Sequence, residues 1–258
     1  MGWIFSPLGD RALVAELQSG LGSGEDWMRM AAAADRLRQS GLNWIVDVIP
    51  AYSTVTVVYE PSALKWDGHP VYSAAEREIG KVLAAPAAHW KNEESIFNIP
   101  VCYGAENGPD LTACALRSGM SEDEFVRAHA EASYQVALVG FVPGFPYMSG
   151  LPPRLAQPRH VTPRRRVPAG SVGIAGGQTG IYPLEVPGGW QLIGRTPLRL
   201  FNASRREPAM LKAGDRVSFV PIDEEQYRHL EEKLAAEAGS QPYSRSISNM
   251  AEQGGGMA

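Results

Sequence analysis

Glycine and proline crowd residues 134–196, and this stretch limits most strongly how the chain can fold. It opens with the apolar run Y-Q-V-A-L-V-G and continues as G-F-V-P-G-F-P-Y-M-S-G-L-P. Glycine permits backbone angles that other residues avoid, and proline fixes one of them. Both alternate here with aromatic residues and short β-branched runs, which a disordered segment would lack. The pattern predicts short strands and structured loops that hold a ligand on a rigid β scaffold.

More motifs follow in the same stretch. They read P-R-H-V-T-P-R-R-R-V-P-A-G at 158–170, S-V-G-I-A-G-G-Q-T-G-I-Y-P at 171–183 and P-G-G-W-Q-L-I-G-R-T-P at 187–197. Together with G-F-V-P-G-F-P-Y, they resemble the allophanate hydrolase subunit 1 family. That family includes the B subunits of bacterial ATP-dependent 5-oxoprolinase, which this chain resembles best, and the kinase inhibitor KipI. The resemblance extends from about residue 5 to about residue 221.

The first third of the chain alternates between strand-like and helix-like patterns. Helical spacing of apolar residues predicts helices over residues 25–39 and 73–85. Short β-rich runs predict strands at 5–8, 12–17, 45–49 and 54–59. The order β-β-α-β-β-α predicts a small α+β domain over residues 1–88, which we assign as ferredoxin-like. Residues 85–94 lose this periodicity and contain a proline, so we expect the domain boundary there.

Residues 89–238 are expected to form the second domain. The pattern S-x-x-E at Ser121 to Glu124 is a capping box and predicts a helix over 122–133. We expect further helices at 111–117 and 223–238, and strands at 95–103, 134–139, 172–174, 181–182, 191–193 and 216–220. Such strands are typical of a β-barrel or sandwich, and the family resemblance implies a cyclophilin-like barrel. Residues 239–258, with three consecutive glycines, are predicted to be a disordered tail.

Composition and motifs exclude several classes of function. The formal net charge is −4, which argues against nucleic-acid binding. The first residues do not show the pattern of a signal peptide, no apolar run of membrane-spanning length is expected, and two cysteines without C-x-x-C spacing fit a reducing compartment. We therefore expect a cytoplasmic protein that binds no membrane. No histidines or carboxylates have metal-ligand spacing, and no G-x-x-x-x-G-K-[ST] loop is present.

An arginine cluster lies between the two glycine-rich motifs. Arginine suits bidentate binding of phosphate or carboxylate, but a cluster can also be a solvated loop with internal salt bridges. The family pattern P-R-x-x-x-P-R falls on Arg159 and Arg164, so we predict that these two bind substrate or phosphate. The remaining members are Arg154, Arg165 and Arg166.

Other candidates come from the helix before residue 134 and from the glycine-rich motifs. The family carries a histidine at the place of His129, which is either catalytic or a packed structural residue. Backbone N–H groups and polar side chains near residue 178 could stabilise developing negative charge, or could form a tight β-turn. Aromatic residues near 145 could line the pocket or belong to the core. We predict catalytic roles for His129, Gln178 and Tyr182, and substrate or phosphate binding by Gly144, Phe145, Tyr147, Gly176, Gly177, Thr179 and Gly180.

The resemblance also implies an activity and partners. It implies that 5-oxo-L-proline is opened to L-glutamate with ATP as co-substrate, at a site that a partner subunit shares. The partners would be the C subunit, a second cyclophilin-like protein, and the A subunit, and the chain would be inactive alone. Two alternatives stay open: an inhibitor that binds a sensor histidine kinase, and a component of a urea- or allophanate-degrading system.

Overall fold

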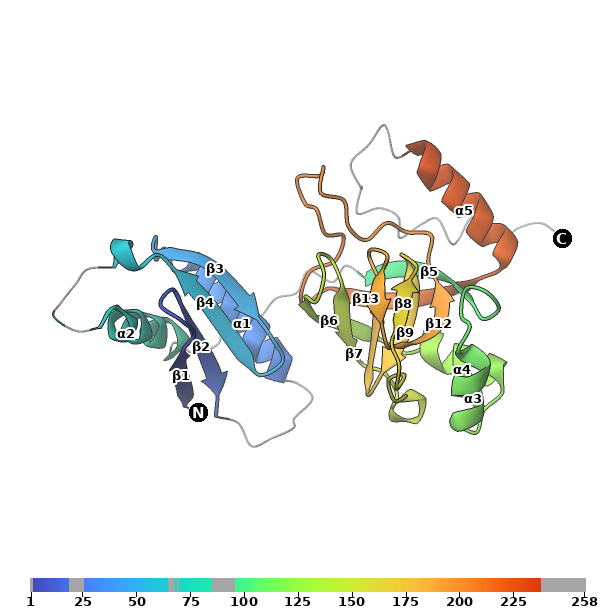
Figure 1. Ribbon diagram of the computed structural model, residues 1–258, viewed down its shortest axis with the longest axis horizontal. Helices are drawn as coiled ribbons and strands as arrows, with labels where there is room; N and C mark the ends of the chain where they lie inside the picture. The colour runs from blue at the N-terminus through green and yellow to red at the C-terminus, as the bar shows by residue number, and fades with distance from the viewer. Residues whose placement is uncertain (1, 19–25, 65–67, 69, 85–95, 238–258) are drawn as a thin grey trace. The chain divides into compact units, whose positions relative to one another are not determined.

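The chain divides into two compact units, Met1–Asn92 and Glu93–Ala258 (Figure 1). The computed structural model describes residues 2–18, 26–64, 68, 70–84 and 96–237. The expected boundary at 85–94 and the expected tail at 239–258 lie outside the described residues.

The N-terminal unit is an antiparallel sheet in the order β1-β2-β4-β3 with two helices. Strand β4 alternates between buried and half-buried residues, as a strand with one covered face should. Both helices pack on that face, because the core joins Met30 and Leu37 of α1 and Ile79 of α2 to Val57 of β4. The elements are β1 (Trp3–Pro7), β2 (Ala12–Leu17), α1 (Asp26–Gln39), β3 (Ile45–Pro50), β4 (Thr54–Tyr59), the 3-10 turn η1 (Pro61–Ala63) and α2 (Val71–Ala84).

The order of these elements is β-β-α-β-β-α, as predicted. Strands β2 and β3 are both antiparallel to β4, which lies between them, so they are parallel to each other. Helix α1 connects them, so β2, α1 and β3 form a β-α-β unit with β4 inserted. The finer assignment as ferredoxin-like stays a prediction.

The C-terminal unit is a closed β-barrel in the order β10-β7-β6-β13-β5-β12-β9. Strands β5 and β13 pair in parallel, and the other neighbouring pairs are antiparallel. The barrel fits a cyclophilin-like fold. Its strands are β5 (Ile96–Tyr103), β6 (Tyr134–Val139), β7 (Pro146–Ser149), β9 (Ser171–Ala175), β10 (Gln178–Ile181), β12 (Gln191–Arg195) and β13 (Arg216–Ile222).

Two short strands form a separate ribbon beside the barrel. Strand β8 (Arg164–Val167) pairs with β11 (Val186–Gly188), so the arginine-rich segment is a strand rather than a free loop. The C-terminal unit also contains α3 (Leu111–Arg117), α4 (Glu122–Ala130), α5 (Glu224–Glu237) and the 3-10 turn η2 (Pro153–Leu155).

Helix α4 begins as predicted and ends earlier. Its start is a complete capping box, because Ser121 Oγ accepts from the Glu124 N–H and the Glu124 carboxylate accepts from the Ser121 N–H. The helix ends at Ala130 rather than at residue 133. The Tyr134 hydroxyl donates to the His129 carbonyl at 2.8 Å, which satisfies a carbonyl that the last helical turn leaves without an intrahelical partner.

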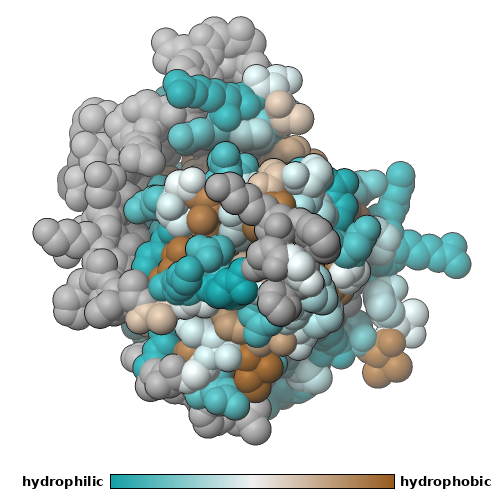
Figure 2. Space-filling model, turned by 90° about the vertical axis from the view of Figure 1, so that its left-hand side faces the viewer, coloured by the Kyte–Doolittle hydropathy of each residue, from teal (hydrophilic) through white to brown (hydrophobic). Residues whose placement is uncertain are grey.

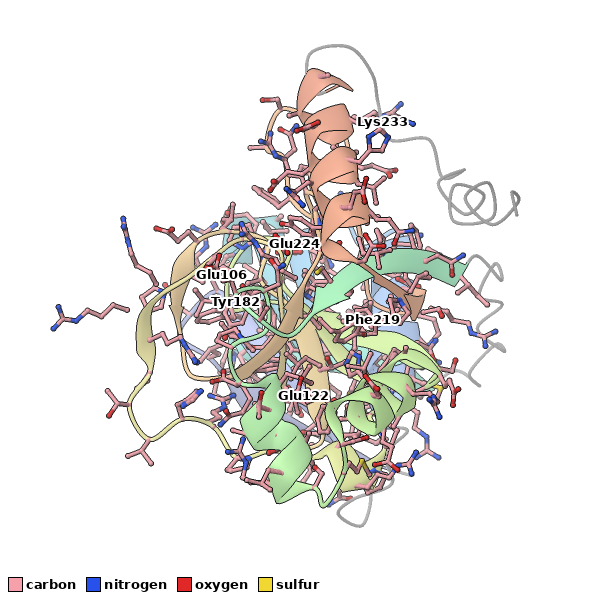
Figure 3. All side chains as sticks on the ribbon, turned by 90° about the vertical axis from the view of Figure 1, so that its right-hand side faces the viewer. Glu106, Glu122, Tyr182, Phe219, Glu224 and Lys233 are labelled. Atoms are coloured by element: carbon pink, nitrogen blue, oxygen red, sulfur yellow. The ribbon has the colours of Figure 1, made fainter. Side chains whose placement is uncertain are left out.

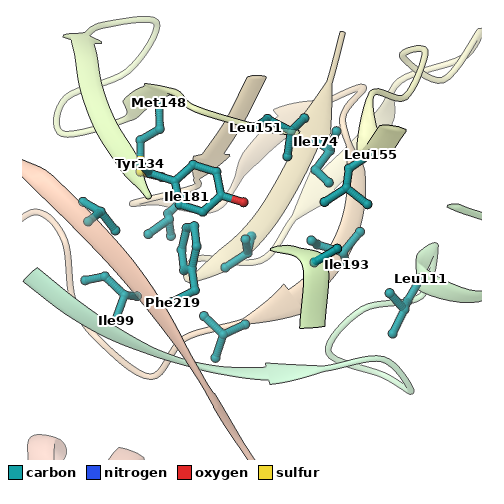
Figure 4. Packing of buried hydrophobic residues seen from close by; sticks show 14 of the residues in the cluster. Ile99, Leu111, Tyr134, Met148, Leu151, Leu155, Ile174, Ile181, Ile193 and Phe219 are labelled. Carbon is teal, nitrogen blue, oxygen red and sulfur yellow. The ribbon is translucent and has the colours of Figure 1, made fainter. Parts of the chain in front are cut away.

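Branched and aromatic side chains fill the barrel interior (Figure 4). Val172 and Ile174 of β9 belong to this core, as does Ile181 of β10, whereas Gly173 and Gly180, which alternate with them, face away. Helices α3 and α4 contribute Leu111 and Phe125 to the same core.

The surface carries apolar residues as separate spots among hydrophilic ones on the face shown in Figure 2. Among the described residues, no helix has both the length and the apolar character needed to span a bilayer.

Candidate functional site

A second apolar cluster lies on the side of β9 and β10 that faces away from the barrel core. Residues of β10 that face outward alternate with core residues, so Gln178, Gly180 and the following Tyr182 share this side. Strands β8 and β11 each contribute one valine to this cluster. We call it the outer cluster: Phe145, Val167, Ala175, Tyr182, Trp190 and Leu192, with the half-buried Val142, Tyr147 and Val186.

Glycines let the aromatic rings of the outer cluster lie directly against the backbone. A Cβ at Gly180 would be 2.9 Å from Phe145 Cζ, and a Cβ at Gly188 would be 2.4 Å from the Tyr182 hydroxyl. Gly180 therefore has a packing role. Gly144, with a φ of +82°, makes the turn before Phe145, where a Cβ would be 2.9 Å from Phe201 Cβ.

The rings pack against one another around Phe145. Its centroid lies 4.7 Å from that of Tyr147, 5.1 Å from Tyr182 and 5.3 Å from Trp190. Phe145 and Tyr182 are buried and Tyr147 is half-buried, so only Tyr147 of these three combines packing with access to solvent. Phe145 is therefore surrounded as a core residue is, which is the second of the two roles considered for the aromatic residues. Tyr182 lies apart from Phe219 of the barrel core (Figure 3).

Arg159 lies over the Trp190 ring, with 6.0 Å between Cζ and the ring centroid. Burial raises the pKa values of Tyr147 and Tyr182, and the positive charge of Arg159 acts in the opposite direction on both. No carboxylate among the described residues pairs with Arg159. This exposed guanidinium is therefore a cation available to an anion beside three aromatic side chains.

Backbone contacts position the segment that carries Arg159. Gln157 forms a β-bridge with Gly176, Gln191 Nε2 donates to the Pro158 carbonyl at 2.8 Å, and the His160 N–H donates to the Gly189 carbonyl at 2.7 Å. The segment is therefore tied to the glycine-rich turn at one end and to the turn before β12 at the other.

Arg164 has a different environment, because a carboxylate pairs with it. Its Nη2 donates to Asp110 Oδ1 at 2.7 Å, while Asp110 Oδ2 accepts from His160 Nε2 at 3.2 Å and from the Leu192 N–H at 2.7 Å. Burial would raise the pKa of Asp110, but these hydrogen bonds and the charge of Arg164 hold it below its ordinary value. Arg164 Nη1 is buried without a hydrogen-bond partner in the described part of the chain.

Sequence reasoning missed Asp110 and His160. Asp110 comes at the end of the turn N-G-P-D and directly before α3, where an aspartate usually caps the helix. Here it makes no side-chain cap and reaches β12 instead. Gly108 makes this possible, because a Cβ there would be 2.1 Å from the Ile193 carbonyl oxygen. The turn N-G-P-D was the sequence signal that could have pointed to Asp110.

A polar network around the buried Gln157 supports the turn between β9 and β10. Gln157 Oε1 accepts from Arg117 Nε at 2.7 Å, and Gln157 Nε2 donates to Ser118 Oγ at 3.0 Å. The turn itself is open, since a Cβ at Gly176 or Gly177 would meet nothing within 4 Å. Gln178 follows as a half-buried residue at the start of β10.

His129 lies inside the barrel, not with the outer cluster. It is 0% exposed and stacks on Phe219 with 4.7 Å between ring centroids. Its Nε2 is 3.1 Å from Thr179 Oγ1, and that hydroxyl donates to the Gly173 carbonyl at 3.0 Å. The hydroxyl must therefore accept from Nε2–H, which leaves Nδ1 to accept from the Tyr103 hydroxyl at 2.9 Å.

Of a catalytic role and a packed structural role for His129, this environment favours the structural role. Burial lowers its pKa to about 3, so the imidazole stays neutral at physiological pH. Both ring nitrogens already have partners inside the protein. Thr179 shares this setting, so the structure separates His129 and Thr179 from Gln178 and Tyr182.

Phe141 is a further residue that the sequence did not single out. It has a φ of +67° although it is not glycine, and its side chain is 62% exposed. The surrounding loop is closed by a hydrogen bond from the Gly140 N–H to the Phe145 carbonyl at 3.1 Å.

Among the described residues, no three histidine, cysteine, aspartate or glutamate side chains lie close enough together to hold a metal ion. The available groups are a free guanidinium, phenols, an amide and backbone N–H groups. Such groups bind and orient an anionic or carbonyl-bearing molecule.

Known proteins resemble the chain over most of its length. Residues 3–211 match the family described as "Carboxyltransferase domain, subdomain C and D". The 5-oxoprolinase B subunit of Bacillus subtilis (strain 168) is 39% identical over 230 residues, which cover 88% of this chain and 95% of that protein. The 5-oxoprolinase B subunit of Escherichia coli O157:H7 is 44% identical over 187 residues, or 70% of this chain and 79% of that protein.

A solved structure shares the fold. The crystal structure of TTHA0988 superposes with a TM-score of 0.69 at 33% identity and covers 83% of this chain, but only 40% of that longer chain. The sequence motifs, the barrel and the curated relatives therefore agree. The chain belongs to the carboxyltransferase subdomain C and D family, among the 5-oxoprolinase B subunits.

Proposed function

We propose that this chain is the B subunit of an ATP-dependent 5-oxoprolinase, which opens 5-oxo-L-proline to L-glutamate. The observation that carries the proposal is the match to the 5-oxoprolinase B subunit of Bacillus subtilis, with 39% identity over 95% of that protein. A match over nearly the whole relative leaves little of it without a counterpart here.

The reaction chemistry fits a binding role for the outer cluster. A lactam is a stable amide, and phosphorylation of its oxygen would make its carbonyl carbon electrophilic. Arg159 and Tyr147 offer donors at the surface, and Gln178 lies on the same side of β10 as Tyr182. Tyr182 is buried under Gly188, so we assign it to packing and positioning rather than to proton transfer.

Partner subunits would supply the remaining chemistry. The sequence carries no G-x-x-x-x-G-K-[ST] loop, which supports an ATP site completed by a C or A subunit. The relatives are named as B subunits, which supports a complex, and TTHA0988 joins a unit of this fold to further chain. We expect the complex in the cytoplasm, where the buried Cys102 and Cys114 stay reduced.

We also assign the N-terminal unit to the ferredoxin-like folds. Its order β1-β2-β4-β3 arises from the β-α-β-β-α-β arrangement when the last strand is moved to the front of the chain. The inserted position of β4 between the parallel β2 and β3 supports this assignment.

A reconstitution assay tests the proposed function. Glutamate formation from 5-oxo-L-proline should require ATP and the partner subunits, and the chain alone should show little activity. Turnover of urea or allophanate instead would assign the chain to a urea-degrading system. Inactivity with every partner, together with tight binding to a histidine kinase and loss of its autophosphorylation, would favour the inhibitor.

A further inference from the structure

We propose that the two arginines of P-R-H-V-T-P-R have different tasks: Arg159, with Trp190 and Tyr147, binds the carboxylate of a small cyclic amide, whereas Arg164 holds the segment in place. This inference rests on the proposed function, because it takes 5-oxo-L-proline as the ligand. It also adds Trp190, which the motif analysis did not assign to the site.

Arg159 has the charge and the geometry for a carboxylate. Its guanidinium lies 6.0 Å from the Trp190 centroid and, in the described part of the chain, has no acidic partner. Contact with an aromatic face holds a planar guanidinium by cation–π attraction and leaves its edge N–H groups for a bidentate ligand. The hydrogen bond from Gln191 to Pro158 fixes the backbone next to it.

Tyr147 provides a second donor at the same place. Its ring centroid lies 5.7 Å from that of Trp190, and it feels the charge of Arg159. No hydrogen-bond partner for its hydroxyl occurs among the described residues, and the side chain is half-buried. One guanidinium and one phenol can bind one carboxylate, and the half-buried ring of Tyr147 offers apolar surface to a flat ring. Trp190 is buried, so it supports Arg159 from beneath rather than contacting the ligand.

Arg164 is not an open cation, because its charge is already paired with Asp110 and its remaining Nη1 is buried. Asp110 neutralises its charge at 2.7 Å and is itself held by His160 and the Leu192 N–H. These contacts connect β8 to the start of α3 and to β12. Arg164 is therefore a positioning residue, which keeps the segment of Arg159 against the barrel.

A carboxylate fits this set of donors better than a nucleotide phosphate. Phosphate chains are usually held by several backbone N–H groups or several cations. Arg159, over an aromatic ring and without a carboxylate partner among the described residues, matches a singly charged group on a small ring.

Calorimetry and kinetics on the assembled complex test the assignment. The ligands are 5-oxo-L-proline, 2-pyrrolidinone, which lacks the carboxylate, and inorganic phosphate. Arg159→Gln should weaken binding of 5-oxo-L-proline and raise its KM about ten- to a hundredfold, as expected for a lost charge-assisted hydrogen bond. The KM for ATP should not change. Arg165→Gln, which removes an exposed arginine of the same segment, is the matched control.

The outcomes separate this inference from the proposed function. The inference is overturned if Arg159→Gln binds 5-oxo-L-proline as well as wild type does, or if the variant raises the KM for ATP instead. The proposed function still stands in either case if the complex is active. If the wild-type complex binds 5-oxo-L-proline but does not hydrolyse it, and Arg159→Gln loses this binding, the proposed subsite is supported and the proposed function is refuted. If wild-type complex does not bind 5-oxo-L-proline, both are wrong. Equal affinity for inorganic phosphate and 5-oxo-L-proline would also refute a carboxylate subsite.

Discussion

His129 should make the barrel unit less stable as the pH falls from 7 to 5. The imidazole is neutral and fully buried, with Nε2–H donating to Thr179 and Nδ1 accepting from Tyr103. Protonation inside the barrel would place a charge among Phe219, Tyr134 and Tyr103, with no carboxylate against it in the described structure. Since the unfolded chain keeps an ordinary histidine, protons favour the unfolded state.

The size of the effect follows from the two pKa values. Burial lowers the pKa of His129 to about 3 in the folded protein, against about 6.5 in an unfolded chain. A lowered folded-state pKa means that stability is complete above pH 6.5 and falls as the pH approaches 3. At pH 5, about 1.5 pH units below the unfolded-state pKa, the loss of unfolding free energy should reach about 2 kcal/mol.

Urea unfolding at pH 7, 6 and 5 measures this loss. The NMR signals of barrel residues should follow the transition, because one bulk signal would mix the two units. His129→Gln keeps an N–H donor but cannot titrate, so its pH dependence should be about 2 kcal/mol smaller than that of wild type. His160→Gln, which removes the half-exposed histidine bound to Asp110, should keep the loss due to His129. Equal pH slopes in wild type and His129→Gln would refute the buried, neutral histidine and restore a catalytic role.

Three further tests probe other parts of the barrel unit. Because Phe141 has a φ of +67°, Phe141→Gly should be more stable than Phe141→Ala by about 1 kcal/mol in thermal unfolding, and the opposite order would show an unstrained loop. Burial raises the pKa of the Cys114 thiol to about 11, so iodoacetamide at pH 8 should label Cys114 only after unfolding, as mass spectrometry can measure. Asp110→Asn should destabilise the unit by about 2 kcal/mol in urea unfolding, because Arg164 loses its charged partner, and an unchanged midpoint would contradict that pairing.

Local patterns were enough to predict much of the element order. The alternation of Val55, Val57 and Tyr59 marks β4, and the capping box at Ser121 marks the start of α4. The ribbon of β8 and β11 could not be found in this way, because R-R-R-V alone is indistinguishable from a charged loop. Its strand character depends on pairing with residues about twenty positions away.

The candidate site shows the same limit more strongly. Arg159 and Arg164 occupy equivalent places in the P-R-x-x-x-P-R pattern, yet Arg164 pairs with Asp110, which lies 54 residues earlier in the sequence. No local signal distinguishes the two arginines. The burial of His129 did have a local signal, because Phe125 lies four residues before it on the same helical face and is also buried.

The glycine-rich motif gains a physical meaning from the outer cluster. Glycine could have indicated a phosphate-binding loop, but Gly180 and Gly188 occur where Phe145 and Tyr182 approach the backbone too closely for a Cβ, and a Cβ at Gly173 would be a tight 3.1 Å from Trp190 Cβ. These glycines specify a layer of aromatic rings outside a barrel whose interior is already filled by branched side chains. Because that layer positions the Trp190 ring beneath Arg159, a change such as Gly173→Ala should disturb ligand binding through packing, without touching the ligand.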